Sequence, residues 1–79
     1  MSTLTVKYFG AIAEVTDTLQ EELDIMDDMS VQSVVDACLQ KYPRLQTMSF
    51  KVAHNQKITD SGETAPGDEI AFLPPFSGG

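Results

Sequence analysis

The clearest chemical potential in the sequence lies in its last six residues, Pro74, Pro75, Phe76, Ser77, Gly78 and Gly79. The two prolines favour a stiff, extended backbone of about 3.1 Å per residue, so this segment can reach roughly 18–20 Å from a folded body. Gly78 and Gly79 have no side chains, so the segment can enter a narrow channel and bring its terminal carboxylate to a buried reaction centre. The alternative interpretation is an idle terminus, because chain ends commonly fray.

The rest of the chain shows none of the usual catalytic motifs. His54, the only histidine, falls in a predicted strand, and Cys38, the only cysteine, falls on the apolar side of a predicted helix. Both are interpreted as structural residues, because a nucleophile needs a neighbouring base and a buried thiol is inert. One cysteine also excludes an internal disulfide and a multi-cysteine zinc site. The sequence therefore predicts no metal site and no catalytic group in the body.

Hydrophobic periodicity predicts the elements that must position this tail. Alternating apolar residues predict strands, one of them a short edge strand, at Thr3–Phe9, Thr18–Ile25, Phe50–His54, Lys57–Thr59 and Asp68–Leu73. An apolar stripe at helical spacing predicts a main helix that begins at the N-cap Ser30 and ends before Pro43. Residues 11–18 predict no more than one loose helical turn.

The order of these elements predicts an α+β fold. A hairpin, one main helix and a later group of strands suit a mixed sheet of four to five strands that the helix covers on one face. Apolar residues on both faces of Asp68–Leu73 predict a central strand, which we expect beside the first strand. Pro74 and Pro75 cannot donate ladder hydrogen bonds, so the sheet ends there. We therefore expect one domain, 1–73, followed by an extended, flexible tail, 74–79.

Composition and charge limit the classes of partner and the cellular location that we expect for this small domain. The 79 residues include 12 acidic and 5 basic side chains, a net charge of −7, which argues against a nucleic-acid partner. Seven acidic residues lie between Glu14 and Asp28 without a base, and a solvated face is favoured over a surface that attracts a basic partner. No apolar run approaches the ~20 residues of a membrane span, and no signal peptide is visible, so we expect a cytoplasmic protein.

The segment "GDEIAFLPPFSGG", from Gly67 to Gly79, resembles the C-terminus of the small subunit of molybdopterin synthase, a ubiquitin-like sulfur carrier. The family pattern there is Gly-Asp-Glu, an apolar strand, Pro-Pro, an apolar residue, a small residue and Gly-Gly, and every position is filled. The segment "KYFGAIAE" is similar to the family's first strand and its exit, with Ala13 in place of the usual arginine. "AHNQ" is similar to the family's Val-Asn-Gln segment, with His54 where an aliphatic residue is usual.

This resemblance implies a ubiquitin-like β-grasp fold and a carrier that is not an enzyme on its own. In the family, an E1-like adenylyltransferase activates the terminal glycine with ATP, so that a transient acyl-adenylate forms at what would be Gly79. A sulfur donor protein then supplies the sulfur that replaces AMP, leaving a thiocarboxylate (1-thioglycine). The large, catalytic subunit of molybdopterin synthase receives the tail, and sulfur passes to cyclic pyranopterin monophosphate to form molybdopterin. No stably bound cofactor is implied.

The resemblance also assigns roles to single residues. Gly79 carries the sulfur, Gly78 allows passage through the channel, and four residues aim and anchor the arm, namely Pro74, Pro75, Phe76 and Ser77. Phe72 and Leu73, near the tail's exit, are candidates for exposed apolar contacts with both partners. The family implies a heterotetramer with two large and two small subunits.

Three alternatives stay open at this point. A sulfur carrier for the thiazole of thiamin shares the Gly-Gly end, although the Pro-Pro pair four residues before it favours molybdopterin. A ubiquitin-like modifier, which joins its terminus to lysines of other proteins, shares the same activation chemistry. The third alternative is a binding domain whose tail has no function.

Overall fold

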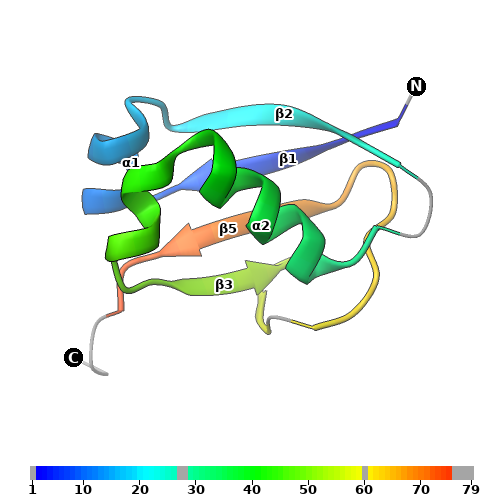
Figure 1. Ribbon diagram of the computed structural model, residues 1–79. Helices are drawn as coiled ribbons and strands as arrows, with labels where there is room; N and C mark the ends of the chain where they lie inside the picture. Colours follow the sequence, from blue (N-terminus) through cyan, green and yellow to red (C-terminus); the bar gives the residue numbers. More distant parts are fainter. Residues whose placement is uncertain (1, 27–28, 60, 76–79) are drawn as a thin grey trace.

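A mixed five-stranded sheet with one long helix across one face forms the computed structural model, which describes residues 2–26, 29–59 and 61–75 (Figure 1). The strands lie in the order β2-β1-β5-β3-β4. Their bounds are Ser2–Tyr8 for β1, Gln20–Ile25 for β2, Lys51–His54 for β3, Lys57–Ile58 for β4 and Glu69–Leu73 for β5. The predicted α+β fold, with its mixed sheet and single main helix, is confirmed.

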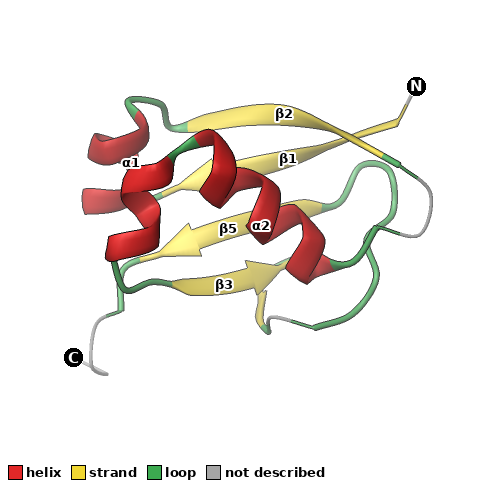
Figure 2. Cartoon of the chain, in the orientation of Figure 1, coloured by secondary structure: helices red, strands yellow, loops and turns green. Residues whose placement is uncertain are grey.

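Strand β5 lies in the centre of the sheet, as the apolar residues on both of its faces predicted. It pairs in parallel with β1, up to Tyr8 opposite Phe72, and antiparallel with β3. On its other side β1 pairs antiparallel with β2. Because β1 and β5 are parallel, their carboxyl ends meet at the same edge of the sheet (Figure 2). The chain leaves the sheet towards its C-terminus at that edge.

Helix α2, Val31–Lys41, covers one face of the sheet and begins and ends as the sequence predicted. The Ser30 side chain accepts a hydrogen bond from the backbone N–H of Ser33 at 3.1 Å, which satisfies one free amide of the first turn. Pro43 follows the helix and opens a short 3₁₀ helix, η1, Pro43–Thr47. No helix in the described part of the chain has the length and apolar character that a bilayer crossing needs.

The segment after β1 differs from its prediction. A six-residue helix, α1, Ala11–Thr16, replaces the expected loose turn, and Asp17 ends it with a left-handed backbone at φ 60°. Strand β2 then starts at Gln20, two residues later than expected, because Leu19 belongs to the connection and is 76% exposed. Leu19 therefore lies outside β2, and the predicted strand Thr18–Ile25 was too long at its start.

The core lies between the sheet and α2. Its fully buried side chains come from every layer of the fold, with Leu4, Val6 and Tyr8 from β1, Val31, Val34 and Cys38 from α2, and Ile70 and Phe72 from β5. Burying apolar side chains of this size stabilises a fold by about 1.5–3 kcal/mol each before entropy is counted. The central strands β1 and β5 therefore form the most firmly held part of the sheet, and the tail is attached to one of them.

Candidate functional site

The tail leaves the sheet beside the point where β1 ends. The backbone N–H of Phe9 donates to the carbonyl of Phe72 at 3.1 Å, which extends the parallel pairing one residue past β1. Pro74 has no N–H to continue the ladder, and its ring lies against Gly10, the residue that links β1 to α1. The first residue of the tail is therefore packed against the body, next to the start of α1.

The structure describes four of the eight predicted site residues. Pro74 is partly exposed and Pro75 is exposed at the end of the described chain. The other four, Phe76, Ser77, Gly78 and Gly79, lie outside the described residues, so their predicted roles stay predictions.

Phe72 is a core residue, and its predicted role as an exposed contact is wrong. Its side chain is 0% exposed, with its ring centroid 4.9 Å from that of Phe50 and 5.6 Å from that of Tyr8. Side chains alternate along a strand, so Phe72 faces the helix while Leu73 faces the opposite side of the sheet. Leu73 is partly exposed and stays a candidate for partner contact.

A surface hollow of about 430 Å³ borders the tail's exit. It is lined by Gly10, Ala13, Glu14, Asp17, Thr18 and Leu19. Phe9, which is 43% exposed, and Leu19 add apolar surface to this end of the molecule. Ala13, which stands where the family pattern usually has arginine, is thus one of the residues that line the hollow. The residues after β1 were known from the sequence only as a loose turn, so this hollow could not be predicted.

Glu21 is the centre of a polar cluster that sequence reasoning missed. Its carboxylate accepts hydrogen bonds from the hydroxyls of Tyr8 at 2.6 Å and Tyr42 at 2.8 Å, and from the ammonium of Lys41. The Glu21 side chain is only 17% exposed, so the interpretation of the acidic run as a solvated face is wrong at this position. The one signal in the sequence was an acidic residue at an inward-facing position of β2.

The pKa values of this cluster favour a charged Glu21. Burial alone would raise the pKa of Glu21, but the hydrogen bonds from Lys41, Tyr8 and Tyr42 outweigh it and hold the pKa below its ordinary value. Burial, together with the hydrogen bond to Glu21, raises the pKa of the Tyr8 hydroxyl, so this group stays protonated and donates. The cluster ties the end of α2 to strands β1 and β2, and its role is structural.

Replacing Glu21 by glutamine should destabilise the protein by about 1–3 kcal/mol at pH 7, because the hydroxyls of Tyr8 and Tyr42 lose a charged acceptor. A carboxyl whose folded pKa is lowered stabilises the fold above its ordinary pKa, here 4.5, and loses that effect as the pH falls through the lowered value. The difference from wild type should therefore shrink below about pH 4. Urea unfolding from pH 3 to pH 7 measures it. Glu22→Gln, the same change at the exposed neighbour, is the control, and an equal loss there would contradict this role.

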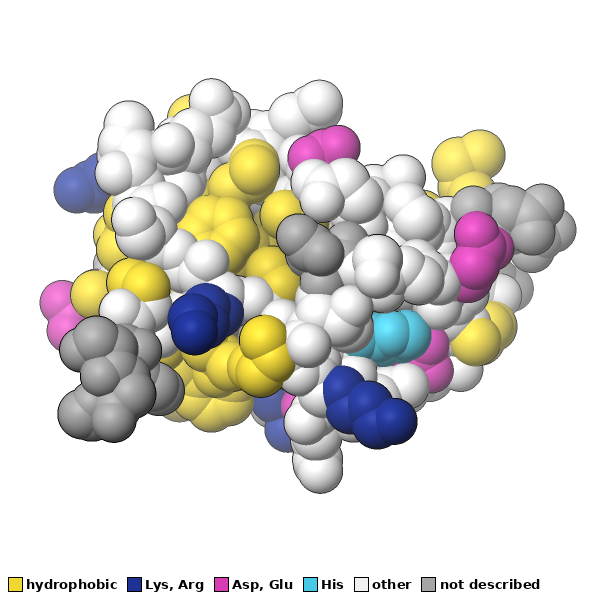
Figure 3. Space-filling view, turned by 90° about the horizontal axis from the view of Figure 1, so that it is seen from below, with side chains coloured by type: hydrophobic (Ala, Val, Ile, Leu, Met, Phe, Trp, Pro, Cys, Tyr) yellow, Lys and Arg dark blue, Asp and Glu magenta, His cyan; other side chains and the backbone are white. Residues whose placement is uncertain are grey.

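Cys38 packs in the core, as predicted, and His54 is partly buried in β3. Cys38 is 1% exposed on α2, and burial is the main cause that raises the pKa of its thiol. His54 Nε2 lies 2.7 Å from a carboxylate oxygen of Asp68, and the hydrogen bond from His54 is the main cause that lowers the pKa of Asp68. Figure 3 shows the face of the molecule on which a histidine side chain (cyan) lies beside an acidic one (magenta). The same Asp68 oxygen accepts from the backbone N–H of Ala65 at 2.9 Å. No group of three or more potential metal ligands occurs among the described residues.

The Cys38 thiol should resist alkylation while the protein is folded. Access requires an opening of the fold, and an opening free energy of roughly 4 kcal/mol would slow the reaction with iodoacetamide by about 10³-fold relative to the unfolded chain. Mass spectrometry of samples taken over time, with and without urea, measures both rates. The control is Cys38→Ala combined with Gln40→Cys, which places a thiol at an exposed position of the same helix. Native Cys38 reacting as fast as this control would contradict its burial.

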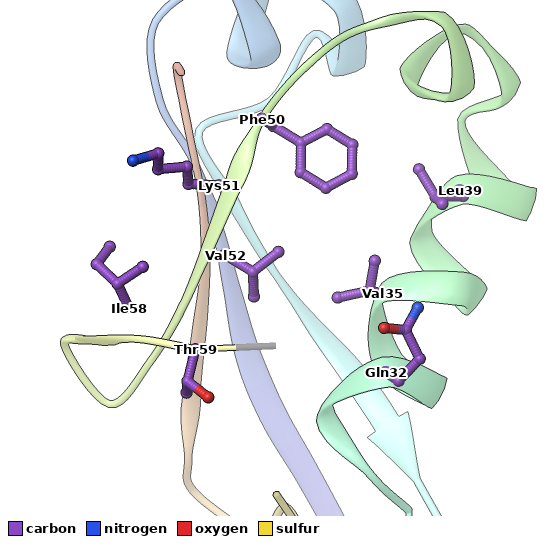
Figure 4. A pocket seen from close by; sticks show the side chains of 8 residues that line it. All are labelled: Gln32, Val35, Leu39, Phe50, Lys51, Val52, Ile58 and Thr59. Carbon is purple, nitrogen blue, oxygen red and sulfur yellow. The ribbon is translucent and has the colours of Figure 1, made fainter. Parts of the chain in front are cut away.

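A second hollow lies between α2 and the β3–β4 edge of the sheet. This groove measures about 500 Å³ and is lined by Gln32, Val35, Leu39, Phe50, Lys51, Val52, Ile58 and Thr59. Figure 4 shows Phe50 and Val52 directed towards the helix residues Val35 and Leu39. The lining is mostly apolar and its only charged side chain is Lys51, so the groove offers mainly apolar contact surface.

Comparison with known proteins finds one family and several relatives that match nearly the whole chain. The model of the ThiS family matches residues 6–79. The "molybdopterin synthase sulfur carrier subunit" of Mycobacterium tuberculosis is 41% identical over 83 aligned residues, which cover all of both chains. The "small archaeal modifier protein 1" of Haloferax volcanii is 33% identical over 92% of this chain and 97% of its own.

Solved structures agree with the sequence relatives. The crystal structure of SAMP1 from Haloferax volcanii matches with a TM-score of 0.83 and 28% identity over 98% of this chain and 99% of its own. A chain of the complex of subunits 1 and 2 of the molybdopterin-converting factor from Helicobacter pylori matches with a TM-score of 0.64 and 26% identity, over 98% of this chain and 99% of that one. The ubiquitin-like β-grasp fold expected from the sequence is thereby confirmed.

Proposed function

Because the chain belongs to the ThiS family, we propose that it is the sulfur carrier subunit of molybdopterin synthase. The observation that carries this proposal is the 41% identity with the Mycobacterium tuberculosis carrier, in an alignment that covers the whole of both chains. The geometry supports it, because β5 is the central strand of the sheet, and Pro74 and Pro75 follow directly at its carboxyl end, where the chain leaves the sheet. The body acts as a rigid holder and the tail acts as the reagent.

The sulfur chemistry takes place at the carboxylate of Gly79. A carboxylate is a poor electrophile, so its oxygen first attacks the α-phosphate of ATP, pyrophosphate leaves, and an acyl-adenylate forms on an E1-like adenylyltransferase. Sulfide (HS⁻) supplied by a donor protein then attacks the carbonyl carbon, the bond to AMP breaks and AMP leaves, which gives a thiocarboxylate and a proton. In the described body, Cys38 is buried and His54 is paired with Asp68, so neither is placed to serve this chemistry. The catalytic residues are therefore proposed to belong to the partners.

The partner that receives the sulfur is proposed to be a large catalytic subunit. The support is the match to a chain of the Helicobacter pylori complex of subunits 1 and 2. We propose that Leu73 and the exposed Phe9, at the tail's exit, contact this subunit while the tail enters it. Two large and two small subunits would form the assembly. Sulfur would pass there to cyclic pyranopterin monophosphate, and ATP would bind only to the activating enzyme.

Intact mass spectrometry tests the carrier function. The protein is incubated with the activating enzyme, ATP and a sulfur donor, and a mass gain equal to the exchange of one oxygen for sulfur is expected. The thiocarboxylated protein is then mixed either with the large subunit and cyclic pyranopterin monophosphate, or with a thiazole synthase and the thiazole precursor of thiamin. Formation of molybdopterin supports the proposal, and turnover of the thiazole precursor alone would assign the carrier to thiamin instead.

Protein modification is a second candidate function, which the 33% identity with the archaeal modifier favours. The same acyl-adenylate would then react with a lysine amine of another protein, and AMP would leave as an amide bond forms. An epitope placed at the N-terminus would reveal such conjugates as higher-mass bands on a denaturing gel. Bands that depend on Gly79 and persist under reducing conditions would support the modifier function.

A further inference from the structure

Gly10 has a backbone conformation that other residues rarely adopt. Its dihedral angles are φ 59° and ψ −137°, at the junction between β1 and α1. A Cβ atom disfavours positive φ, and this ψ lies far from the left-handed helical region that Asn and Asp tolerate. The chain needs this conformation to turn from the end of β1 into α1, where the carbonyl of Gly10 accepts from the N–H of Ala13 at 3.1 Å.

The space that a side chain of Gly10 would fill is occupied by Pro74. A Cβ built on Gly10 would lie 2.7 Å from Cγ of Pro74, 3.8 Å from Cδ and 3.9 Å from Cβ. The other two glycines in the described ranges, Gly62 and Gly67, also have positive φ, at 109° and 86°. A Cβ on either of them would meet no atom within 4 Å. Only Gly10 of these three therefore has both an unusual conformation and a neighbour packed against its missing side chain.

We propose that Gly10 is a positioning residue that sets the direction in which the C-terminal arm leaves the body, an inference that rests on the proposed carrier function. The last hydrogen bond between the β1 and β5 segments joins Phe9 to Phe72, and Pro74 cannot add another. The ring of Pro74 is instead held by its contact with Gly10. Because Pro74 is the first residue of the tail, this contact lies at the base of the arm.

The direction fixed at Pro74 matters because the residue after it is also a proline. Two consecutive prolines form a stiff, extended unit, so a rotation at Pro74 is carried through Pro75 to the residues beyond. For an arm roughly 15 Å long, a rotation of about 10° at its base moves its end by about 2–3 Å. A misplacement of about 1 Å at a reacting atom can slow a reaction by about 100-fold.

The test compares Gly10→Ala with a matched control, Gly67→Ala, which introduces a Cβ at positive φ without a neighbour. Both proteins are converted to the thiocarboxylate, and sulfur transfer is followed in single turnovers at a saturating concentration of the large subunit. Gly10→Ala is expected to transfer sulfur about 10- to 100-fold more slowly than wild type, while folded Gly67→Ala transfers at the wild-type rate. Equal rates in wild type and Gly10→Ala, or equal losses in both variants, would overturn the inference.

Pro74→Ala supplies a second, independent arm of the experiment. This change removes the Cγ atom that the new side chain of Gly10→Ala would meet. Adding Gly10→Ala to Pro74→Ala should therefore slow sulfur transfer much less than adding Gly10→Ala to the wild-type protein does. If Gly10→Ala does not fold, Pro74→Ala alone tests the inference. An arm without the contact between Pro74 and Gly10 should transfer sulfur more slowly than wild type. A wild-type rate of transfer would refute the positioning role of Gly10. Failure of wild-type protein to accept sulfur would refute the proposed function instead, which keeps the two failures distinct.

Discussion

Removal of Gly78 and Gly79 is expected to abolish thiocarboxylate formation and leave the body folded. The shortened chain still ends in a carboxylate, but that carboxylate then belongs to Ser77, which carries a side chain and ends roughly 6–7 Å nearer to the body. A channel shaped for a bare glycine end would exclude it, so we expect no sulfur incorporation above background. Intact mass measurement after incubation with the activating enzyme, ATP and the sulfur donor detects the result.

Two companion measurements separate a lost reagent from a lost fold. Urea unfolding of the shortened protein should match wild type within about 0.5 kcal/mol, because the deleted residues follow the last described strand and carry no apolar side chains. A protein lengthened by one alanine beyond Gly79 should be as inactive as the shortened one, although it keeps both glycines. Sulfur incorporation into the lengthened protein, or molybdopterin formation in cells that contain only this version, would contradict the role of the free glycine end.

The elements of the fold were predictable where a local signal and the tertiary structure agree. Ser30 is an N-cap in both the sequence interpretation and the structure, and Pro43 follows the end of the helix. The apolar residues on both faces of the last strand indicated a central position, which β5 occupies. Local periodicity reports burial directly, so it locates strands and helices well.

The features that were not predicted depend on contacts between distant parts of the chain. Glu21 has acidic neighbours in the sequence, but its partners Tyr8 and Lys41 lie 13 and 20 residues away. The contact of Gly10 with Pro74 joins the two ends of the sequence, and it follows only from the parallel pairing of β1 with β5. Nothing in the residue types alone gives such pairs, because many registers of the strands would be compatible with the same periodicity.

Phe72 shows how an apolar residue beside a functional segment can be misassigned. Its position two residues before the Pro-Pro pair suggested a contact surface, but alternation along β5 places it under α2 and leaves Leu73 on the other side. The sequence contained this alternation, and the choice between the two faces required the position of the helix. The distance of Phe72 along the chain from the tail therefore said nothing about whether its side chain is accessible to a partner.

Replacing Phe72 by alanine should give the largest loss of stability of any change discussed, about 3–5 kcal/mol, because it leaves a cavity between the rings of Tyr8 and Phe50. A domain of this length has a free energy of unfolding of roughly 4–12 kcal/mol, so the variant should be close to unfolding at room temperature. Urea unfolding at pH 7 measures the loss. Phe72→Leu fills most of the volume and should lose less, which keeps the comparison possible if the alanine variant does not fold.

Leu73→Ala is the matched change on the opposite face of the same strand. Its partly exposed side chain should contribute less than about 1.5 kcal/mol to folding, and its removal should weaken binding to the large subunit by about tenfold, because truncation of an apolar interface contact costs about 1–2 kcal/mol. Isothermal calorimetry with the large subunit measures this binding. The opposite result would be a Phe72→Ala variant that is stable but binds the large subunit poorly, and a Leu73→Ala variant that is unstable but binds normally. That result would mean that Phe72 faces the partner and Leu73 faces the core. In that case the partner would have to approach from the side that α2 covers, which the packing of α2 against Phe72 leaves no room for.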